Sequence, residues 1–455
     1  MGGESGRYYM IGGRRDGALA RIMRLPDRAN ETSPIRGVIM RKKSILMFVP
    51  AFLYSTSFAA AQGEPRQQVQ LPEGEGKETV QVLCSQCHSL NMIANSGGYT
   101  HDGWKQLIRS MVSLRSEQEE RVSAYLAKHY APKPRPEAVV IPGSATVSIK
   151  EWLVPTLGSR PHDPAVAPDG SVWWTGQYAN RLGRLDPRTG TLREYLLKTP
   201  ESGPHGIIAD KSGNIWYTGI SKRHVGKLDP VSGEVTEYLL PDTTARGPHT
   251  PVFDQKGNLW FTMQSGMVGR INPVTGEVKI VRTPTSNTYP YGIAVNSKGI
   301  PWYVDFRGNR VGSVDPVTME IREFKLPDTA ARPRRLAITP DDMVWYTDHA
   351  RGYLGRFDPK TGAVREWRSP GGLQSRPYGI AASGPVIWYS ESGVRPNTLV
   401  RFDPATEKFQ TWTIPSGGGV VRHMMSTPNG NLVLALSGVN RVGLVEIDGK
   451  RLTHD

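Results

Sequence analysis

The chain has 455 residues, which is long for one ordinary domain and favours two or more folded units. Its two Cys exclude a disulfide framework, and its 11 Trp against 10 Phe indicate a tryptophan position that recurs. The formal net charge of +14 suggests nucleic-acid binding at first sight. Residues 1–61, however, hold ten Lys and Arg against four Asp and Glu, and so supply +6 of that charge. The remaining basic residues are scattered, which favours an ordinary basic secreted protein without a nucleic-acid partner.

The N-terminal region has the pattern of an export signal. Three basic residues, Arg41–Lys43, precede the apolar run Ile45–Tyr54, and small residues follow, ending in Ala59–Ala61. A charged region, an apolar region and an Ala-x-Ala site are typical of a signal peptide, and the apolar run is too short to span a bilayer. An uncleaved anchor is the alternative. Because Met40 directly precedes the basic residues, we expect an over-called upstream extension at 1–39, a signal peptide at 40–61, and a periplasmic or secreted protein with no mature membrane span.

The run Cys84-Ser85-Gln86-Cys87-His88 is the attachment signature of c-type haem. Its chemistry needs two thiols that add to the haem vinyl groups, followed by a histidine that lies under the iron. A zinc site would need a second ligand pair, and a thioredoxin-like motif would need a βαβ pattern. The chain has no further Cys and no such pattern here. We therefore predict a haem c bound covalently by Cys84 and Cys87, with His88 as the proximal iron ligand.

The residues around this motif predict a small all-α domain at 62–130. Residues 75–90 read as a helix that leads into the motif, residues 104–111 have helical spacing, and Ser116–Glu119 resembles a capping box that opens a last helix. The stretch resembles the small cytochrome c domains that are fused to periplasmic enzymes. Their last helix often carries a Tyr-Leu pair, here Tyr125-Leu126. The resemblance implies a cytochrome c-like haem domain.

The distal iron ligand is less firmly indicated than the proximal one. Met111 is the preferred candidate, because it lies well downstream of the motif in a helical stretch. A methionine that only fills the core is the alternative, and His101 and His129 stay open as ligands. Without a sixth ligand the iron would be five-coordinate and able to bind small ligands.

The rest of the chain is a repeat that follows a proline-rich linker at 131–146. A Trp-aromatic core recurs every 42–44 residues, at Trp173, Trp216, Trp260, Trp302, Trp345 and Trp388, and Leu432-Val433-Leu434 is a degenerate seventh copy. This period, with several short strands in each unit, is typical of β-propeller blades. We predict a seven-bladed all-β propeller at 147–455. The strand-like segment Val147–Pro155 precedes the first core, and we expect it to complete the last blade beside residues 442–453.

The repeat unit resembles the streptogramin (virginiamycin) B lyase family over about residues 145–450. The segment Pro204–Pro230 shows this best, with Pro-His-Gly-Ile, Gly-Asn-x-Trp-Tyr-Thr and Val-Gly-Lys-Leu-Asp-Pro in succession. The resemblance implies seven blades and a lyase that opens a cyclic depsipeptide at its ester linkage with a bound magnesium ion. It also implies a catalytic set: a His after Pro in one blade, and in the next blade a Glu-x-His with a Glu after the Trp core.

This catalytic set is not matched in any blade. The Pro-His position reads His162, His205, His249, Tyr291, Arg334, Tyr378 and His423, and none of the residues two places earlier is Glu. The position after the core reads Gly176, Gly219, Met263, Asp305, Asp348, Glu391 and Ser437. Equivalent strand ends of a propeller surround one mouth of its channel, so these side chains are expected to converge on a metal or polar-ligand site. The candidate catalytic residues are His205, His249, Asp348, His349 and Glu391; the alternative is that they cap turns and pair with Arg307, Arg351 and Arg395.

Three functions fit this organisation. The preferred one is an exported c-type haem protein in electron transfer or redox sensing, whose propeller binds a small-molecule ligand or a redox partner protein at its channel mouth. The first alternative is an active lyase of the virginiamycin B type, which would also bind Mg²⁺. The second is a quinoprotein-like dehydrogenase that passes electrons to its own haem, although no quinone-anchoring motif is present. Fold similarity alone does not decide between them.

Overall fold

The computed structural model describes residues 69–86, 90–94, 96, 98–109 and 111–450. The expected upstream extension and signal peptide lie outside these residues, as do Cys87 and His88. Among the described helices, none is both long enough and apolar enough to cross a membrane.

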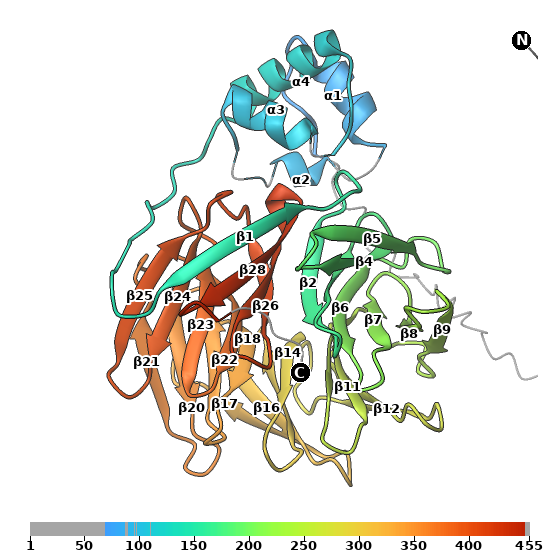
Figure 1. The fold of residues 1–455 in the computed structure, drawn as a ribbon, viewed down its shortest axis with the longest axis vertical. Helices are drawn as coiled ribbons and strands as arrows, with labels where there is room; N and C mark the ends of the chain where they lie inside the picture. The colour runs from blue at the N-terminus through green and yellow to red at the C-terminus, as the bar shows by residue number, and fades with distance from the viewer. Residues whose placement is uncertain (1–68, 87–89, 95, 97, 110, 451–455) are drawn as a thin grey trace, which may run out of the picture. The chain divides into compact units, whose positions relative to one another are not determined.

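Four helices form the N-terminal segment (Figure 1): α1 (Lys77–Cys84), α2 (Asn91–Ala94), α3 (His101–Arg109) and α4 (Ser116–His129). Their apolar faces pack into a small core that includes Val80, Trp104 and Tyr125. The two large aromatic residues satisfy their polar atoms with backbone carbonyls. The Trp104 indole donates to the carbonyl oxygen of Tyr130 at 3.1 Å, and the Tyr125 hydroxyl donates to that of Pro72 at 2.6 Å. The predicted helical character is confirmed, although the expected helix at 75–90 ends at Cys84.

The last helix begins where the sequence predicts, but its cap differs by one position. Ser116 is the first helical residue and Arg115 precedes it. The Arg115 backbone N–H donates to Oε1 of Gln118 at 3.4 Å. The reciprocal contact of a capping box therefore involves Gln118, and the expected pair of Ser116 and Glu119 is wrong by one residue.

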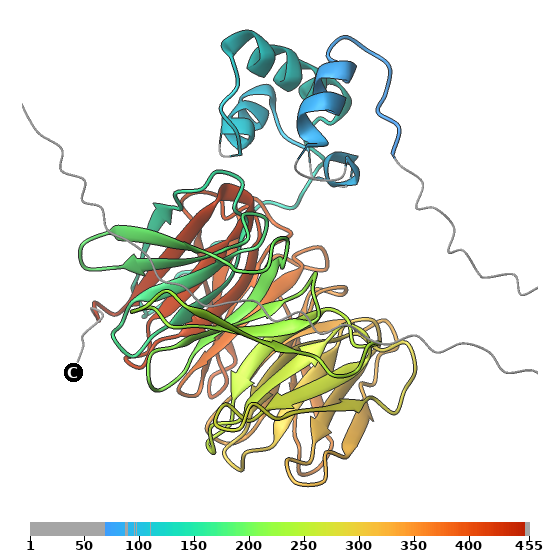
Figure 2. The ribbon, with the colours of Figure 1, turned by 90° about the vertical axis from the view of Figure 1, so that its right-hand side faces the viewer.

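Seven four-stranded antiparallel sheets follow in the described part of the chain, and both views show them as separate twisted blades (Figures 1 and 2). Blade 1 contains β2 (Pro161–Val166), β3 (Val172–Gly176), β4 (Arg181–Asp186) and β5 (Thr191–Leu196). Blade 2 contains β6 (Pro204–Ala209), β7 (Ile215–Gly219), β8 (His224–Leu228) and β9 (Val235–Leu239). Blade 3 contains β10 (Pro248–Phe253), β11 (Leu259–Met263), β12 (Met267–Ile271) and β13 (Val278–Arg282). Blade 4 contains β14 (Pro290–Val295), β15 (Pro301–Asp305), β16 (Arg310–Val314) and β17 (Ile321–Lys325). Blade 5 contains β18 (Pro333–Ile338), β19 (Val344–Asp348), β20 (Tyr353–Phe357) and β21 (Val364–Arg368). Blade 6 contains β22 (Pro377–Ser383), β23 (Val386–Glu391), β24 (Thr398–Asp403) and β25 (Lys408–Thr413).

Blade 7 joins the two ends of the propeller. It contains β26 (Val421–Ser426), β27 (Leu432–Leu436) and β28 (Arg441–Ile447), and its outer strand is β1 (Val147–Leu153). The register runs from Val147 opposite Ile447 to Leu153 opposite Arg441. The predicted closure is therefore confirmed, because the last sheet combines strands from both ends of the propeller.

The repeated residues build the blades by packing. The six repeat tryptophans are at most 5% exposed, so they form the core between neighbouring sheets. In blade 2, Gly226 lies opposite Tyr217, and a Cβ there would come within 2.2 Å of the tyrosine ring. Only glycine leaves room for the aromatic ring of the neighbouring strand at this point. The Trp-aromatic and Val-Gly motifs of the sequence are therefore structural.

The expected linker is extended and in part hydrogen-bonded to blade 6. The backbone of Arg395 donates to the carbonyl of Pro136 at 3.0 Å and accepts from Ala138 at 3.2 Å. Further on, the N–H of Thr411 donates to the carbonyl of Ile141 at 3.0 Å. The linker residues from 136 to 141 are thus held along the propeller rather than spaced away from it.

Candidate functional site

The threonines of the core strands in blades 1, 2, 3 and 5 fix the channel-facing position of the next blade. The Thr175 hydroxyl donates to the carbonyl of His205 at 2.8 Å, and the Thr218 hydroxyl donates to that of His249 at 2.6 Å. Thr262 makes the same bond to the carbonyl of Tyr291 at 2.6 Å. Because these bonds involve only the backbone of the next blade, the side chain at that position is free to vary. This site has the same scaffold in successive blades and different chemistry.

The strand register corrects the assignment of this position in blade 7. In blade 2, Pro204 pairs with Gly219 at the start of the inner strand, and in blade 7 Val421 pairs with Leu436 in the same way. Arg422, not His423, is therefore equivalent to His205, and Leu436 rather than Ser437 follows the core. We call the seven equivalent residues the mouth ring: His162, His205, His249, Tyr291, Arg334, Tyr378 and Arg422.

Blades 1 to 3 contribute three stacked histidines to the mouth ring. The ring centroids of His162 and His205 lie 3.7 Å apart, and those of His205 and His249 lie 3.8 Å apart. The next neighbour is Tyr291, 3.8 Å from His249. All three histidines are at most 3% exposed, and burial, reinforced by nearby guanidinium groups, lowers their pKa well below the usual value. They are neutral at pH 7.

Arg335 links three blades across the channel. From blade 5 it donates to Oδ1 of Asp163 in blade 1 at 2.7 Å and to Oγ1 of Thr250 in blade 3 at 3.0 Å. Nδ1 of His162 lies 2.9 Å from the same carboxylate oxygen. Burial raises the pKa of Asp163 to about 6, although Arg335 opposes that shift. Arg335 and Asp163 are each 1% exposed, so this ion pair is part of the interior.

Arg334, the neighbour of Arg335, lies in an aromatic and neutral environment. Its guanidinium carbon is 3.7 Å from the ring centroid of Tyr378 and 4.5 Å from that of Phe306. It donates to Nε2 of His349 at 2.9 Å, and Nδ1 of that histidine lies 3.2 Å from the carbonyl of Pro377. His349 is thereby assigned as the neutral tautomer that donates from Nδ1.

The two tyrosines of the mouth ring contact each other, and both contact Arg334. The hydroxyls of Tyr291 and Tyr378 lie 2.6 Å apart, and both residues are at most 5% exposed. Burial alone would raise the pKa of Tyr378, but the guanidinium groups of Arg334, Arg422 and Arg335 outweigh it and lower the pKa to about 8. The same burial raises the pKa of Tyr291 to about 12. Tyr378 is therefore the more acidic partner of the pair.

The carboxylates predicted to join the histidines do not do so. Oδ1 of Asp348 accepts backbone N–H groups, among them those of Arg332 at 3.1 Å and Ala350 at 3.2 Å, and its Oδ2 accepts Nε of Arg351 at 2.6 Å. Glu391 accepts three hydrogen bonds of 2.6 Å, from Ser369, Gly371 and Thr398. Asp348 thus holds the turn that follows its own strand and the connection before blade 5, and Glu391 holds the connection between blades 5 and 6. Of the five candidates, His205 and His249 lie together, His349 contacts the ring through Arg334, and Asp348 and Glu391 are turn caps.

The residues do not fit a magnesium ion. Among the described residues, one group with potential ligand atoms within 4.8 Å of one another was found, formed by His162, Asp163 and His205. Mg²⁺ prefers several oxygen ligands in octahedral geometry, and this group offers one carboxylate that already binds Arg335. The Mg²⁺ expected for a lyase therefore has no suitable ligand set here.

The haem-related residues lie in the helical segment as far as the structure describes them. Cys84 is the last residue of α1, is half-buried and packs against the helical core. Met111 follows α3, is half-buried, and its N–H donates to the carbonyl of Ile108 at 2.8 Å. Because Cys87 and His88 lie outside the described residues, covalent haem and its iron ligands stay predictions.

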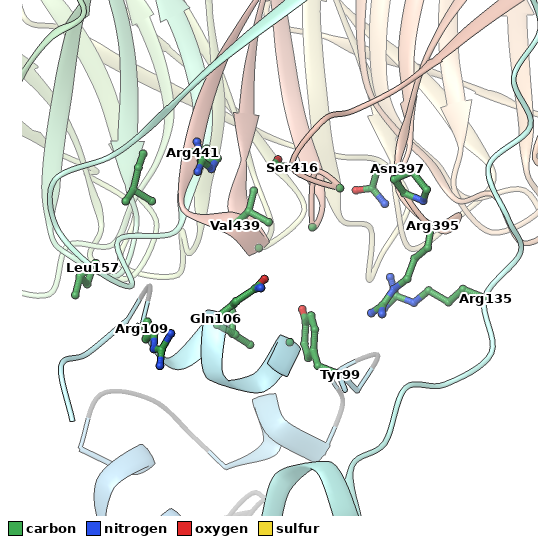
Figure 3. A pocket seen from close by; sticks show the side chains of 17 residues that line it. Tyr99, Gln106, Arg109, Arg135, Leu157, Arg395, Asn397, Ser416, Val439 and Arg441 are labelled. Atoms are coloured by element: carbon green, nitrogen blue, oxygen red, sulfur yellow. The ribbon is translucent and has the colours of Figure 1, made fainter. Parts of the chain in front are cut away.

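A separate pocket of about 640 Å³ is lined in part by loops of blades 6 and 7. Figure 3 shows Arg395, Asn397, Ser416, Val439 and Arg441 among its lining residues. None of the mouth-ring residues lines it. The pocket is therefore distinct from the histidine and arginine cluster.

The sequence predicts only part of the site. The repeat places Tyr291, Arg334 and Tyr378 at the mouth, but it does not indicate Arg335, Arg422 or Asp163 as site residues. A signal was present in blade 5, where Arg334-Arg335 stands in place of the Pro-His-Gly residues His205-Gly206 of blade 2. Two adjacent arginines at an inward position of a repeat indicate a departure that packing does not require.

The fold and the site together define a closed seven-bladed β-propeller with a basic, histidine-lined mouth. Residues 144–384, more than half of the chain, match the Virginiamycin B lyase family, and the chain belongs to that family. A solved streptogramin B lyase is 25% identical, with a TM-score of 0.61 over 66% of this chain and 98% of that one.

Two further solved structures show the same fold at lower identity. A catalytically inactive histidine-to-alanine virginiamycin B lyase from Staphylococcus aureus, solved with quinupristin, is 22% identical, with a TM-score of 0.60 over 66% of this chain and 99% of that one. Kuenenia stuttgartiensis hydrazine synthase is 13% identical, with a TM-score of 0.54 over 65% of this chain and 97% of that one. No curated protein matches the chain.

Proposed function

We propose that this protein is an exported c-type haem protein, periplasmic or secreted, that serves electron transfer or redox sensing. Its propeller binds a ligand or redox partner at the channel mouth. The observation that carries the proposal is the Cys84-x-x-Cys87-His88 motif, which follows an export-type N-terminus. The mouth ring supports the second part, because buried polar groups that converge from all seven blades are typical of a binding site.

The described residues of the helical segment are compatible with a haem. Cys84 ends α1 and, with Leu83 and Leu90, borders the apolar core, so the first thiol of the motif lies at the edge of that core. In a haem domain Cys84 and Cys87 would hold the macrocycle, and His88 would ligate the iron. The bound haem would supply a one-electron carrier.

Covalent attachment is the direct test of this proposal. The protein is produced with its export signal in a host that matures c-type cytochromes, and haem is detected on the polypeptide after denaturing electrophoresis. Haem staining is expected for the wild type and for Ser85→Ala, whose side chain is exposed within the motif. Cys84→Ser and Cys87→Ser, separately, are expected to reduce it, and the double variant to abolish it. An unstained wild-type protein with an intact fold would refute the haem proposal.

The distal ligand has its own experiment. Oxidised and reduced visible spectra of the wild type are expected to show a His/Met-ligated low-spin iron. Met111→Ala is expected to change the spectrum, whereas His101→Ala, whose imidazole lies 3.0 Å from Glu120, is expected to leave it unchanged. A spectrum that does not respond to Met111→Ala would refute the choice of this ligand.

Lyase activity is the second candidate function, because the chain belongs to the Virginiamycin B lyase family. Against it stand the unmatched Glu-x-His set and the turn-capping roles of Asp348 and Glu391. Purified protein is incubated with quinupristin, with and without Mg²⁺, and ring opening is followed by mass spectrometry. Magnesium-dependent opening would establish a lyase, and an intact depsipeptide with folded protein would exclude this activity.

A further inference from the structure

The mouth of the propeller carries more positive charge than its own acidic groups neutralise. Four arginines belong to it: Arg160, Arg334, Arg335 and Arg422. Among the described residues, the only ion pair that any of them makes is that of Arg335 with Asp163. Arg334 has only neutral partners, and none of the turn-capping carboxylates reaches the other two. Three guanidinium groups are therefore left without a protein counter-ion.

Several donors of this cluster are buried and have no partner in the described part of the chain. These are the Nε groups of Arg334, Arg335 and Arg422, and each lacks a hydrogen bond although it is shielded from solvent. An unsatisfied buried donor destabilises the fold, so such groups normally have a partner in the functional state. Arg335 is 1% exposed, whereas Arg160, Arg334 and Arg422 are half-buried, so the cluster is open to a ligand at its outer side.

The backbone at Arg160 indicates that its side chain is kept at a cost. Arg160 has a φ of 54°, in the left-handed region that favours glycine. Blades 2 and 3 have Gly203 and Gly247 at the equivalent position, with φ values of 58° and 60°. Arg160 therefore keeps a side chain at a position where two other blades use glycine. Burial and the charge of Arg422 also lower the pKa of Arg160 to about 9, as expected for a guanidinium group that lacks a counter-ion.

Arg334 is oriented before any ligand binds. It is stacked on Tyr378 and held by a hydrogen bond to His349, which in turn is held by the carbonyl of Pro377. A planar guanidinium fixed in this way loses little freedom when it binds an oxyanion. The neutral histidines next to it add no negative charge that would compete with such a ligand.

We propose that the channel mouth binds a small oxyanion, a carboxylate or a phosphate group, held by Arg334, Arg422 and Arg160. This deepens the proposed function, on whose ligand-binding part it rests, by assigning the chemical class of the ligand. Charge-assisted hydrogen bonds from guanidinium groups are the strongest way to bind either oxyanion. A metal ion is disfavoured at the same place, because the carboxylate of Asp163, the oxygen ligand that the described cluster offers, is already paired with Arg335.

The test is calorimetric titration of the full-length protein, in parallel with inorganic phosphate, with succinate and with Zn²⁺. Sodium chloride of equal ionic strength corrects for screening. Binding of phosphate or succinate with one site per chain is expected, and the stronger of the two identifies the source of the oxyanion. Arg334→Gln and Arg422→Gln are each expected to weaken it at least tenfold, and Arg334→Lys to weaken it less than Arg334→Gln.

Arg193 provides a matched control variant. It is an exposed arginine stacked on Tyr195 with its guanidinium carbon 4.6 Å from the ring centroid, so Arg193→Gln removes a similar contact away from the mouth. Its affinity is expected to stay within twofold of the wild type, and circular dichroism verifies that every variant is folded.

The outcomes separate this inference from the function on which it rests. Absence of oxyanion binding, or equal oxyanion affinity in the wild type and all variants, would overturn the oxyanion inference. Binding of Zn²⁺ alone would also overturn the oxyanion inference. The ligand-binding part of the proposed function would then stand, with the metal at His162, Asp163 and His205. The haem stain of the same preparation reports on the electron-transfer part of the proposal and does not depend on any of these titrations.

Discussion

The mouth ring consists of two arcs that differ in chemistry although they occupy one position of the repeat. Blades 1 to 3 contribute His162, His205 and His249, which are stacked, deeply buried and neutral. Blades 4 to 7 contribute Tyr291, Arg334, Tyr378 and Arg422, which combine phenols with permanent positive charge. We call these two sets the histidine arc and the arginine arc.

The difference teaches how the repeat separates architecture from chemistry. In both arcs a hydroxyl of one blade holds the backbone of the next, as Thr218 does for His249 at 2.6 Å and Thr347 does for Tyr378 at 2.8 Å. The side chain contributes little to this connection. A propeller can therefore place imidazole on one side of its channel and guanidinium on the other without altering a blade.

The largest expected effect is acid destabilisation through the histidine arc. In the unfolded chain each histidine takes up a proton near pH 6.5, whereas in the folded protein burial lowers the pKa of all three. The unfolded state then binds more protons, so stability falls as pH falls below about 6.5, by roughly 2 kcal/mol per histidine between pH 7 and pH 5. Asp163, whose folded pKa is raised to about 6, opposes this by about 1 kcal/mol in the same range.

Urea unfolding followed by tryptophan fluorescence at pH 7 and pH 5 measures this loss. His249→Gln is expected to reduce the loss of unfolding free energy between pH 7 and pH 5 by the contribution of one histidine, about 2 kcal/mol. Equal stability at the two pH values would show that the arc is protonated in the folded state.

The next effect concerns the ion pair that joins the arcs. Arg335→Ala leaves the buried carboxylate of Asp163 without its partner, and breaking such a pair costs about 3–5 kcal/mol. The double variant Asp163→Ala with Arg335→Met removes both charges and is expected to recover at least half of that loss. Denaturant unfolding at pH 7.5 measures the unfolding free energy of the single and the double variant. A double variant as unstable as the single one would mean that Arg335 stabilises the propeller by packing instead.

A smaller effect is expected for the carboxylates outside the arcs. Glu391→Gln weakens a buried acceptor of three hydrogen bonds and should cost about 1–3 kcal/mol in unfolding free energy. Oxyanion affinity at the mouth should stay within twofold of the wild type, since the Glu391 carboxylate binds Ser369 and Gly371 and none of the mouth arginines. Loss of binding without loss of stability would place this residue in the site after all.

The fold was predictable from the sequence because packing repeats. The Trp spacing predicted seven blades, and the strand-like segment at 147–155 predicted their closure, since both follow from the pattern of apolar and turn residues. The N-terminal helices followed from their apolar spacing in the same way.

The site was predictable only where it obeyed the repeat. His205 and His249 were found because they stand after proline in a recognisable motif. Arg335 and Asp163 pair across the channel although they are 172 positions apart, and no local pattern predicts such a contact. Asp348 and Glu391 were misassigned because a carboxylate after a core strand serves equally well as a ligand or as a turn cap. In blade 7 no Trp marks the register, so the sequence alone does not distinguish Arg422 from His423 at the mouth position.

The smallest expected effect concerns the left-handed backbone conformation of Arg160. It tests whether this strained conformation serves ligand binding. Arg160→Gly should stabilise the propeller by about 0.5 kcal/mol, because relief of the left-handed conformation outweighs the added freedom of the unfolded chain. Arg376→Gly is the matched variant, because Arg376 has a φ of 49° at the equivalent position of blade 6 and an exposed side chain. Both should gain similar stability in urea unfolding, but only Arg160→Gly should weaken oxyanion binding, by roughly three- to tenfold if one charge-assisted hydrogen bond is lost. Equal affinities in the two variants would show that the strain at Arg160 serves no ligand and that the arc ends at Arg422.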